Sequence, residues 1–297
     1  MFTQPLRLSF TFAVLFAVSI LFAQNTAAAG TCDATHIRWA SSSNRVYVEN
    51  GGTCTLTDIE TYGSSSIPLD LVDPANNIWF LGADLYVKDG STFELHGSSI
   101  GGDVDELRLK SNNDGTANSV VSVRADHGTL DIDTTSITSW DEAAAGPDTE
   151  YTTYQRAYIR VRSKLDVDDV TPLESRMDIN NSDIGYLGYA GSEAYGLTWK
   201  VLGSTGPHGI GIFDLVGVYG DVTNNTIHHN YFGVYTYGAE AMTLVDNEVH
   251  DNVVYGIDPH DDSDYLLIDN NNAHHNGSHG IICSKRCNNL TITNNTS

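Results

Sequence analysis

The C-terminal third of the chain repeats itself with a period of about 23 residues. Three segments align at a histidine and a glycine column: IHHNYFGVYTYG (227–238), VHDNVVYGIDPHD (249–261) and AHHNGSHGIICSK (273–285). An asparagine column recurs in the same register at Asn225, Asn247, Asn271 and Asn295. Fixed periods of this length are typical of solenoids, propellers and arrays.

The repeat units favour strands over helices. They contain short β-runs such as MTLVDNEV and YLLIDNN, separated by Asn, Gly and Asp, without a helical period. A leucine-rich repeat would show its leucine spacing, and a propeller blade needs about 40 residues. The sequence therefore predicts an all-β fold, a right-handed parallel β-helix whose coils contribute about three short strands each. Stacked asparagines would hydrogen-bond from coil to coil, which explains their abundance.

The first 29 residues are predicted to be a secretory signal. Arg7 precedes an apolar run (LSFTFAVLFAVSILFA), and small residues follow at 27–29. The alternative is an uncleaved anchor. After cleavage we expect no membrane span, and a protein exported to the cell exterior or wall, or to the periplasm of a bacterium. Residues 30–297 are expected to form one β-helix domain, with an excursion at 142–150 and a C-terminus that is incomplete by register.

The charge and cysteine content of the chain bear on its partners and on its disulfides. The chain has 15 Lys and Arg against 38 Asp and Glu, a net charge of −23. This argues against nucleic acid as a partner, because phosphate binding needs clustered cations. An even number of cysteines in an exported chain suggests disulfides, most simply Cys32–Cys54 near an N-terminal cap, and Cys283–Cys287.

One repeat unit carries the run YGIDPHD at 255–261. Together with HHNYFGVYTYG before it and HGIICSK after it, this run resembles the catalytic motif of the mannuronan C5-epimerases. The similarity extends from about Leu81 to the end and is strongest from Asn180 onward. The resemblance implies an isomerase that converts β-D-mannuronate to α-L-guluronate residues within alginate, an anionic polysaccharide.

The chemistry of such a reaction assigns roles to the residues of the motif. The C5 hydrogen lies α to a charged carboxylate, so an enzyme must neutralise the carboxylate, remove the proton and return one from the opposite face. His260 is the candidate base, because a neutral imidazole is available near neutral pH. Asp258, two residues away on the same strand face, would orient His260 or share a proton with the substrate carboxylate. Tyr255 resembles the family tyrosine and would transfer the second proton, with Tyr237 as its rival one coil earlier.

Few cations are available to neutralise the substrate carboxylate. Between residues 201 and 297 the only Lys and Arg are Lys285 and Arg286. Lys285 resembles the family's basic residue after the His-Gly-Ile-Ile run and is the first candidate, with Arg286 as its substitute. Lys200 lies on the same nominal face. We therefore expect substrate binding to depend on these few cations.

Further contacts and rival functions stay open at this point. Asp261 and His279, which flank the candidate residues, are expected to bind substrate. No cofactor is predicted firmly, but a Ca²⁺ site is open at the acidic run Asp258, Asp261, Asp262 and Asp264, although its spacing follows no EF-hand or calcium-binding nonapeptide. One rival function is a polyuronate lyase, which abstracts the same proton and then expels the O4 substituent. The other is a non-catalytic β-helix that binds polysaccharide.

Overall fold

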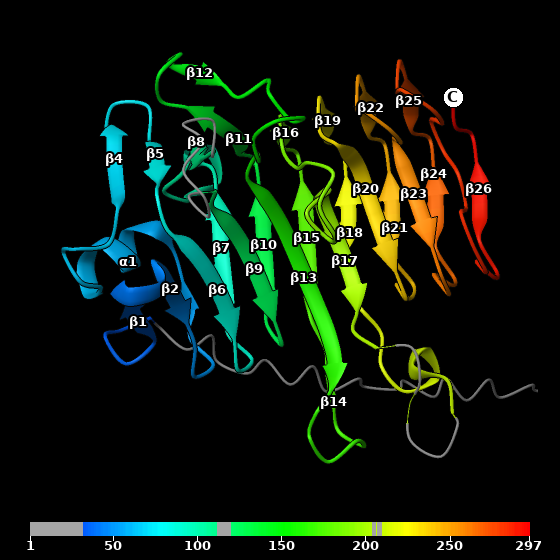
Figure 1. Cartoon of the computed structure of the whole chain (residues 1–297), viewed down its shortest axis with the longest axis horizontal. Helices are drawn as coiled ribbons and strands as arrows, with labels where there is room; N and C mark the ends of the chain where they lie inside the picture. The colour runs from blue at the N-terminus through cyan, green and yellow to red at the C-terminus, as the bar shows by residue number, and fades with distance from the viewer. Residues whose placement is uncertain (1–31, 112–119, 204–205, 207–209) are drawn as a thin grey trace, which may run out of the picture.

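The computed structural model describes residues 32–111, 120–203, 206 and 210–297, so the predicted secretory signal lies outside the described residues. In this part of the chain, mostly parallel strands form three sheets along a solenoid (Figure 1). From β7 onward the chain visits the second, third and first sheets in turn, and each round completes one coil. This arrangement is the parallel β-helix predicted from the repeat. No described helix is long and apolar enough to cross a bilayer.

The first sheet carries the candidate site and runs in the order β1-β2-β6-β9-β13-β17-β20-β23, with β14 beside β13. Its strands are β1 (Ile37–Ala40), β2 (Arg45–Val48), β6 (Asp84–Lys88), β9 (Ser122–Asp126), β13 (Tyr158–Leu165), β14 (Pro172–Leu173), β17 (Gly196–Val201), β20 (Phe232–Tyr237) and β23 (Ile257–His260). The second sheet contains β3 (Thr53–Cys54), β7 (Thr92–His96), β10 (Thr129–Asp133), β15 (Arg176–Asn180), β18 (Asp221–Thr223), β21 (Thr243–Val245), β24 (Leu267–Asp269) and β26 (Thr291–Thr293). The third sheet contains β4 (Leu69–Asp73), β5 (Ile78–Leu81), β8 (Glu106–Lys110), β11 (Ser136–Asp141), β12 (Gly146–Pro147), β16 (Asp183–Gly185), β19 (Thr226–His228), β22 (Glu248–His250) and β25 (Asn272–His274).

Four antiparallel strand pairs and a few short helices are added to the parallel strands of the solenoid. The pairs are β1–β2, β4–β5, β11–β12 and β13–β14. Strand β12 lies in the excursion expected at 142–150 and folds back on β11. Helix α1 (Leu56–Tyr62) starts with a capping box formed by Thr55 and Asp58, which satisfies two free backbone N–H groups. The 3-10 helices are η1 (Ser41–Ser43), η2 (Ser98–Ile100) and η4 (Ile212–Asp214).

Alternation of side chains along the strands builds the core. Every second strand residue points inward, so aliphatic side chains from successive coils stack in columns. Leu197, Val234 and Ile257 form one such column in the first sheet, and each is fully buried. Their polar neighbours in sequence point outward on the same strands, and the outward positions of β20 and β23 supply the candidate site.

Asparagine ladders close two corners of the solenoid. In the predicted column, the side-chain oxygen of each asparagine accepts hydrogen bonds from the backbone N–H and the side-chain amide of the asparagine one coil before. This series runs through Asn225, Asn247, Asn271 and Asn295. A second ladder runs through Asn230, Asn252 and Asn276, each two residues after a histidine of the recurring column. The predicted disulfides Cys32–Cys54 and Cys283–Cys287 are both present.

We expect Asn247→Ala to lower the free energy of unfolding by about 3–5 kcal/mol. The substitution leaves the backbone N–H of buried Asn225 without its partner, at a cost of about 1–3 kcal/mol. It also removes one of the two acceptors of the Asn225 side-chain amide and a donor to the carbonyl of Val222, and each lost hydrogen bond costs about 1 kcal/mol. Urea unfolding measures the change. Asn272→Ala, at an exposed position of β25, is the control and should change stability by less than about 0.5 kcal/mol. Equal effects of the two substitutions would contradict the ladder's role.

Candidate active site

The candidate site lies on the outer face of the first sheet, where β20 and β23 pair in register. Asp258 pairs with Tyr235, and His260 pairs with Tyr237. Ile257 and Pro259, the alternate residues of β23, are buried. Asp258 and His260 therefore share one face of the strand, as the two-residue spacing predicts.

A cavity of about 440 Å³ opens beside these two residues. Tyr255, Asp258 and His260 line it together, so three of the four predicted catalytic residues meet around one space. Its remaining walls come from residues that sequence reasoning missed: Tyr195, Phe232, Tyr235, Ile282, Cys283 and Ser284. A space of this size, lined by aromatic rings with a few ionisable groups, is typical of a small-molecule or sugar site.

His260 faces a buried carboxylate. Its Nδ1 lies 3.0 Å from Oδ2 of Asp261, which is 4% exposed. The contact is close, although it is not aligned as a hydrogen bond. Burial lowers the pKa of His260, while Asp261 acts in the opposite direction. His260 is therefore mostly neutral at physiological pH, and with Nδ1 facing Asp261 its Nε2 is the nitrogen left to accept a proton.

Asp258 is buried and poised between its two protonation states. Its residue is 1% exposed, and burial raises its pKa to about 6. The hydroxyl of Ser284, from the next coil, donates a hydrogen bond to its carboxylate and opposes this shift. A carboxyl with this pKa is able to hold a proton near a second carboxylate, which is the role that a bound uronate would require.

Tyr255 and Tyr237 occupy different places. Strand β23 begins at Ile257, so Tyr255 lies just before it and lines the same cavity as His260. Its ring stacks on His279 with centroids 5.7 Å apart. Tyr237 stacks on His260 at 6.2 Å, but it is not among the residues that line the cavity, and burial raises its pKa. Tyr255 is therefore the better placed of the two for proton transfer, and exposed His279 supports its ring.

The predicted cations are bound to acidic residues. Lys285 contacts Asp261, with its Nζ 3.4 Å from that carboxylate. Arg286 contacts Asp261 at 2.6 Å and Asp262 at 3.0 Å. The side chains of both cations are more than half exposed, and both contact the carboxylate that faces His260. Asp261 thus contacts the base and both cations, and its predicted contact with substrate stays a prediction.

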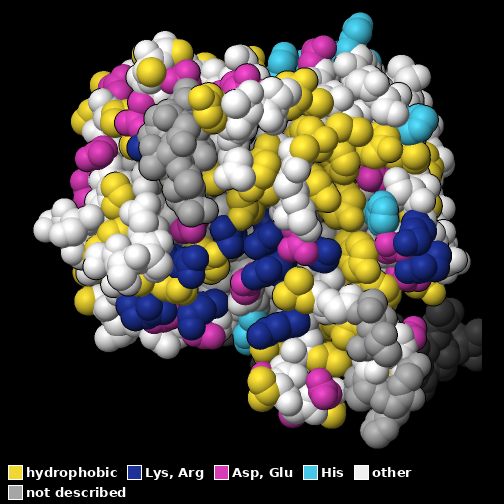
Figure 2. Space-filling view, in the orientation of Figure 1, with side chains coloured by type: hydrophobic (Ala, Val, Ile, Leu, Met, Phe, Trp, Pro, Cys, Tyr) yellow, Lys and Arg dark blue, Asp and Glu magenta, His cyan; other side chains and the backbone are white. Residues whose placement is uncertain are grey.

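A row of cations upstream leads to the site. Figure 2 shows Lys and Arg side chains gathered in a band across the face of the molecule. Six Lys and Arg residues on strands of the first sheet make up what we call the cationic track: Arg45, Lys88, Arg124, Arg160, Arg162 and Lys200. Arg162, Lys200, Tyr237 and His260 pair in one column across adjacent strands, so the track continues into the site. Apart from Lys200, these cations are not among those on which the sequence predicted substrate binding to depend, and that expectation stays a prediction.

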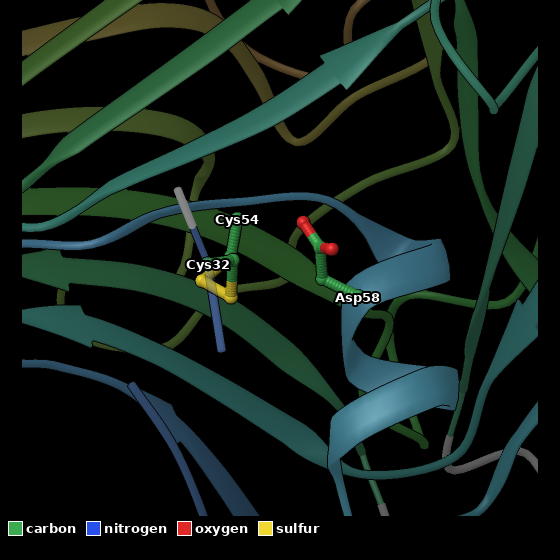
Figure 3. Close-up of side chains that lie close together, drawn as sticks. All are labelled: Cys32, Cys54 and Asp58. Atoms are coloured by element: carbon green, nitrogen blue, oxygen red, sulfur yellow. A yellow bond between two sulfur atoms is a disulfide. The ribbon is translucent and has the colours of Figure 1, made fainter. Parts of the chain in front are cut away.

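The acidic run, where the sequence leaves a Ca²⁺ site open, stays untested as a metal site. Its carboxylates turn to different donors: Asp258 to Ser284, Asp261 to the two cations, Asp262 to Arg286 and Asp264 to Asn288. Among the described residues, three metal-ligating types converge at Cys32, Cys54 and Asp58. Figure 3 shows the two cysteines joined as a disulfide, which offers no thiolate to a metal. We therefore derive no step through a metal ion.

Comparisons with known proteins agree with the fold and the motif. Residues 177–297 match the family described as right handed beta helix region, which gives the predicted hand. The mannuronan C5-epimerase of Pseudomonas aeruginosa is 36% identical over 120 residues, which cover 40% of this chain and 22% of that protein. The mannuronan C5-epimerase of Pseudomonas fluorescens is 28% identical over 176 residues, which cover 57% and 30%.

A solved structure extends the similarity of fold. The crystal structure of the periplasmic alginate epimerase AlgG matches with a TM-score of 0.60 at 20% sequence identity, over 79% of this chain and 48% of that one. The resemblance to mannuronan C5-epimerases predicted from the motif is confirmed by these matches. The chain spans about a fifth to a third of the length of the two curated relatives.

Proposed function

We propose that this protein, which is related to the mannuronan C5-epimerases, converts β-D-mannuronate to α-L-guluronate residues in an exported alginate polymer. The observation that carries the proposal is the shared cavity of Tyr255, Asp258 and His260 at the end of the cationic track. The track supplies Lys and Arg side chains that can bind an anionic chain, although each also pairs with an Asp or Glu of the protein. The cavity supplies the groups that move protons.

The proposed reaction exchanges one proton at C5. His260 removes it through Nε2, and the imidazolium that forms is stabilised by Asp261. The protonated carboxyl of Asp258 shares its proton with the substrate carboxylate, while Lys285 or Arg286 adds positive charge, so that negative charge accumulating there is stabilised. Tyr255 then returns a proton to the opposite face of C5, and exchange with solvent resets both groups.

Incubation with polymannuronate in deuterated water tests this function. We expect deuterium at C5 of newly formed guluronate by NMR, with chain length unchanged, because the returned proton comes from groups that exchange with solvent. A lyase would instead shorten the polymer and produce an unsaturated sugar that absorbs in the ultraviolet. An unchanged polymer without deuterium would refute both reactions and favour a binding protein.

A further inference from the structure

A carboxylate of the protein itself lies in the cationic track. Oε1 of Glu193 is 2.8 Å from Nζ of Lys200, and its Oε2 is 3.1 Å from a terminal nitrogen of Arg160. Arg162 lies farther away, at 3.9 Å, and is held by two short hydrogen bonds to Asp126. Glu193 is therefore the main counter-ion of Arg160 and Lys200.

These two cations have little else to neutralise them. In the described part of the chain, neither Arg160 nor Lys200 has a second carboxylate within 4 Å. Arg160 is 6% exposed, and its Nε is buried without a hydrogen-bond partner. Burial and the neighbouring Arg162 lower the pKa of Arg160. A pair of cations in this state binds an anion strongly, because a buried charge without a partner is costly.

The backbone presents Glu193 under strain. It lies in the loop between β16 and β17 and has φ of +62°, a conformation that costs a residue with a long side chain about 1–2 kcal/mol. Its ion pairs offset this cost, so the loop is held against the track by contacts that another carboxylate is able to replace.

The position of this carboxylate suits a neighbouring unit of a bound polymer. Lys200 lies two strands before His260 in the same column, a separation of about 9.6 Å at the usual spacing between strands. The proposed polymer carries one carboxylate on every sugar. When one sugar is at His260, the carboxylate of another sugar farther along the chain therefore lies near Lys200.

We infer that Glu193 occupies a carboxylate subsite formed by Arg160 and Lys200, and that a uronate carboxylate of the polymer displaces it on binding. This inference rests on the proposed function. Glu193 then competes with substrate, keeping the net charge of the subsite at +1 at rest where the two cations alone would give +2, and weakening the binding of polymers that carry no carboxylate there. Release of Glu193 also frees its loop beside the bound chain.

The test measures the binding of polymannuronate by isothermal titration calorimetry. It compares proteins with Glu193 and with Glu193→Gln, both in a His260→Ala background so that the polymer is not converted. We expect Glu193→Gln to lower Kd about tenfold and to make binding more sensitive to salt, since one competing anion is removed. Glu193→Asp keeps the charge but shortens the side chain, so its Kd should lie between that of the protein with Glu193 and that of the Glu193→Gln variant. This second variant decides the question if Glu193→Gln does not fold.

A matched control separates competition from overall charge. Glu142→Gln removes the same charge from an exposed residue that pairs with Lys110 of the third sheet, and should leave Kd within about twofold. Equal or weaker binding by the folded Glu193 variants would overturn the inference while leaving the proposed function intact. An absence of polymannuronate binding by every protein, wild type included, would overturn the proposed function itself and the inference with it.

Discussion

Replacement of His260 by alanine is expected to reduce the rate of guluronate formation by about 10²–10⁴-fold, the usual contribution of a general base. Its Nδ1 faces Asp261, and its ring lines the cavity that Asp258 and Tyr255 share. Without the imidazole, no neutral base of suitable pKa is left at that wall of the cavity. NMR measurement of newly formed guluronate at fixed enzyme concentration gives the rate, and the affinity for polymannuronate should change little.

A second histidine provides the matched control for this variant. His250 stacks between His228 and His274 on the third sheet, with ring centroids 5.4 and 5.1 Å away, as the recurring histidine column predicts. His250→Ala should keep the wild-type rate within about twofold. Retention of activity by His260→Ala, or an equal loss in both variants, would show that His260 is another ladder histidine and not the base.

The last coils could be predicted from sequence because their length is nearly constant. Val234 and Ile257 pair in adjacent coils and are 23 residues apart. Upstream, Ile159 and Leu197 also pair, but they are 38 residues apart. The additional residues form excursions such as the one that contains β14, which follow no period. The strand register of the upstream coils could therefore not be predicted from the sequence. For the same reason, the alignment of Arg160 and Arg162 with the site could not be predicted.

Other missed residues carried a usable signal. Tyr235 lies two residues after Gly233, just as Asp258 lies two after Gly256, and the two pair in the structure. Ser284 is four after Gly280, the same offset as His260 from Gly256. Applying these offsets to every repeat would have placed both residues at the site. The raised pKa of Asp258 could not be predicted in this way, because it results from burial of the carboxyl in the folded protein.

Asp258→Asn is expected to stabilise the protein by about 3 kcal/mol at pH 7.5. Burial raises the pKa of this carboxyl from its ordinary value of 3.8 to about 6, and a pKa difference of one between the folded and unfolded states corresponds to about 1.4 kcal/mol. Between these values the folded state binds more protons than the unfolded state, so wild-type stability falls as pH rises from about 4 to 6. Asparagine carries no charge to desolvate, so the variant should lack this decline.

Urea unfolding at pH 4 and pH 7.5 measures both effects. The variant and the wild type should be nearly equal in stability at pH 4, where Asp258 is largely protonated, and should diverge at pH 7.5. Asp251→Asn is a control of opposite sign, because a hydrogen bond with His250 lowers the pKa of exposed Asp251 and its favourable effect is lost as pH falls. A constant difference between wild type and Asp258→Asn at both pH values would rule out the raised pKa. Divergence, accompanied by loss of epimerisation, would mean that the protein keeps a destabilising buried carboxyl for its chemistry.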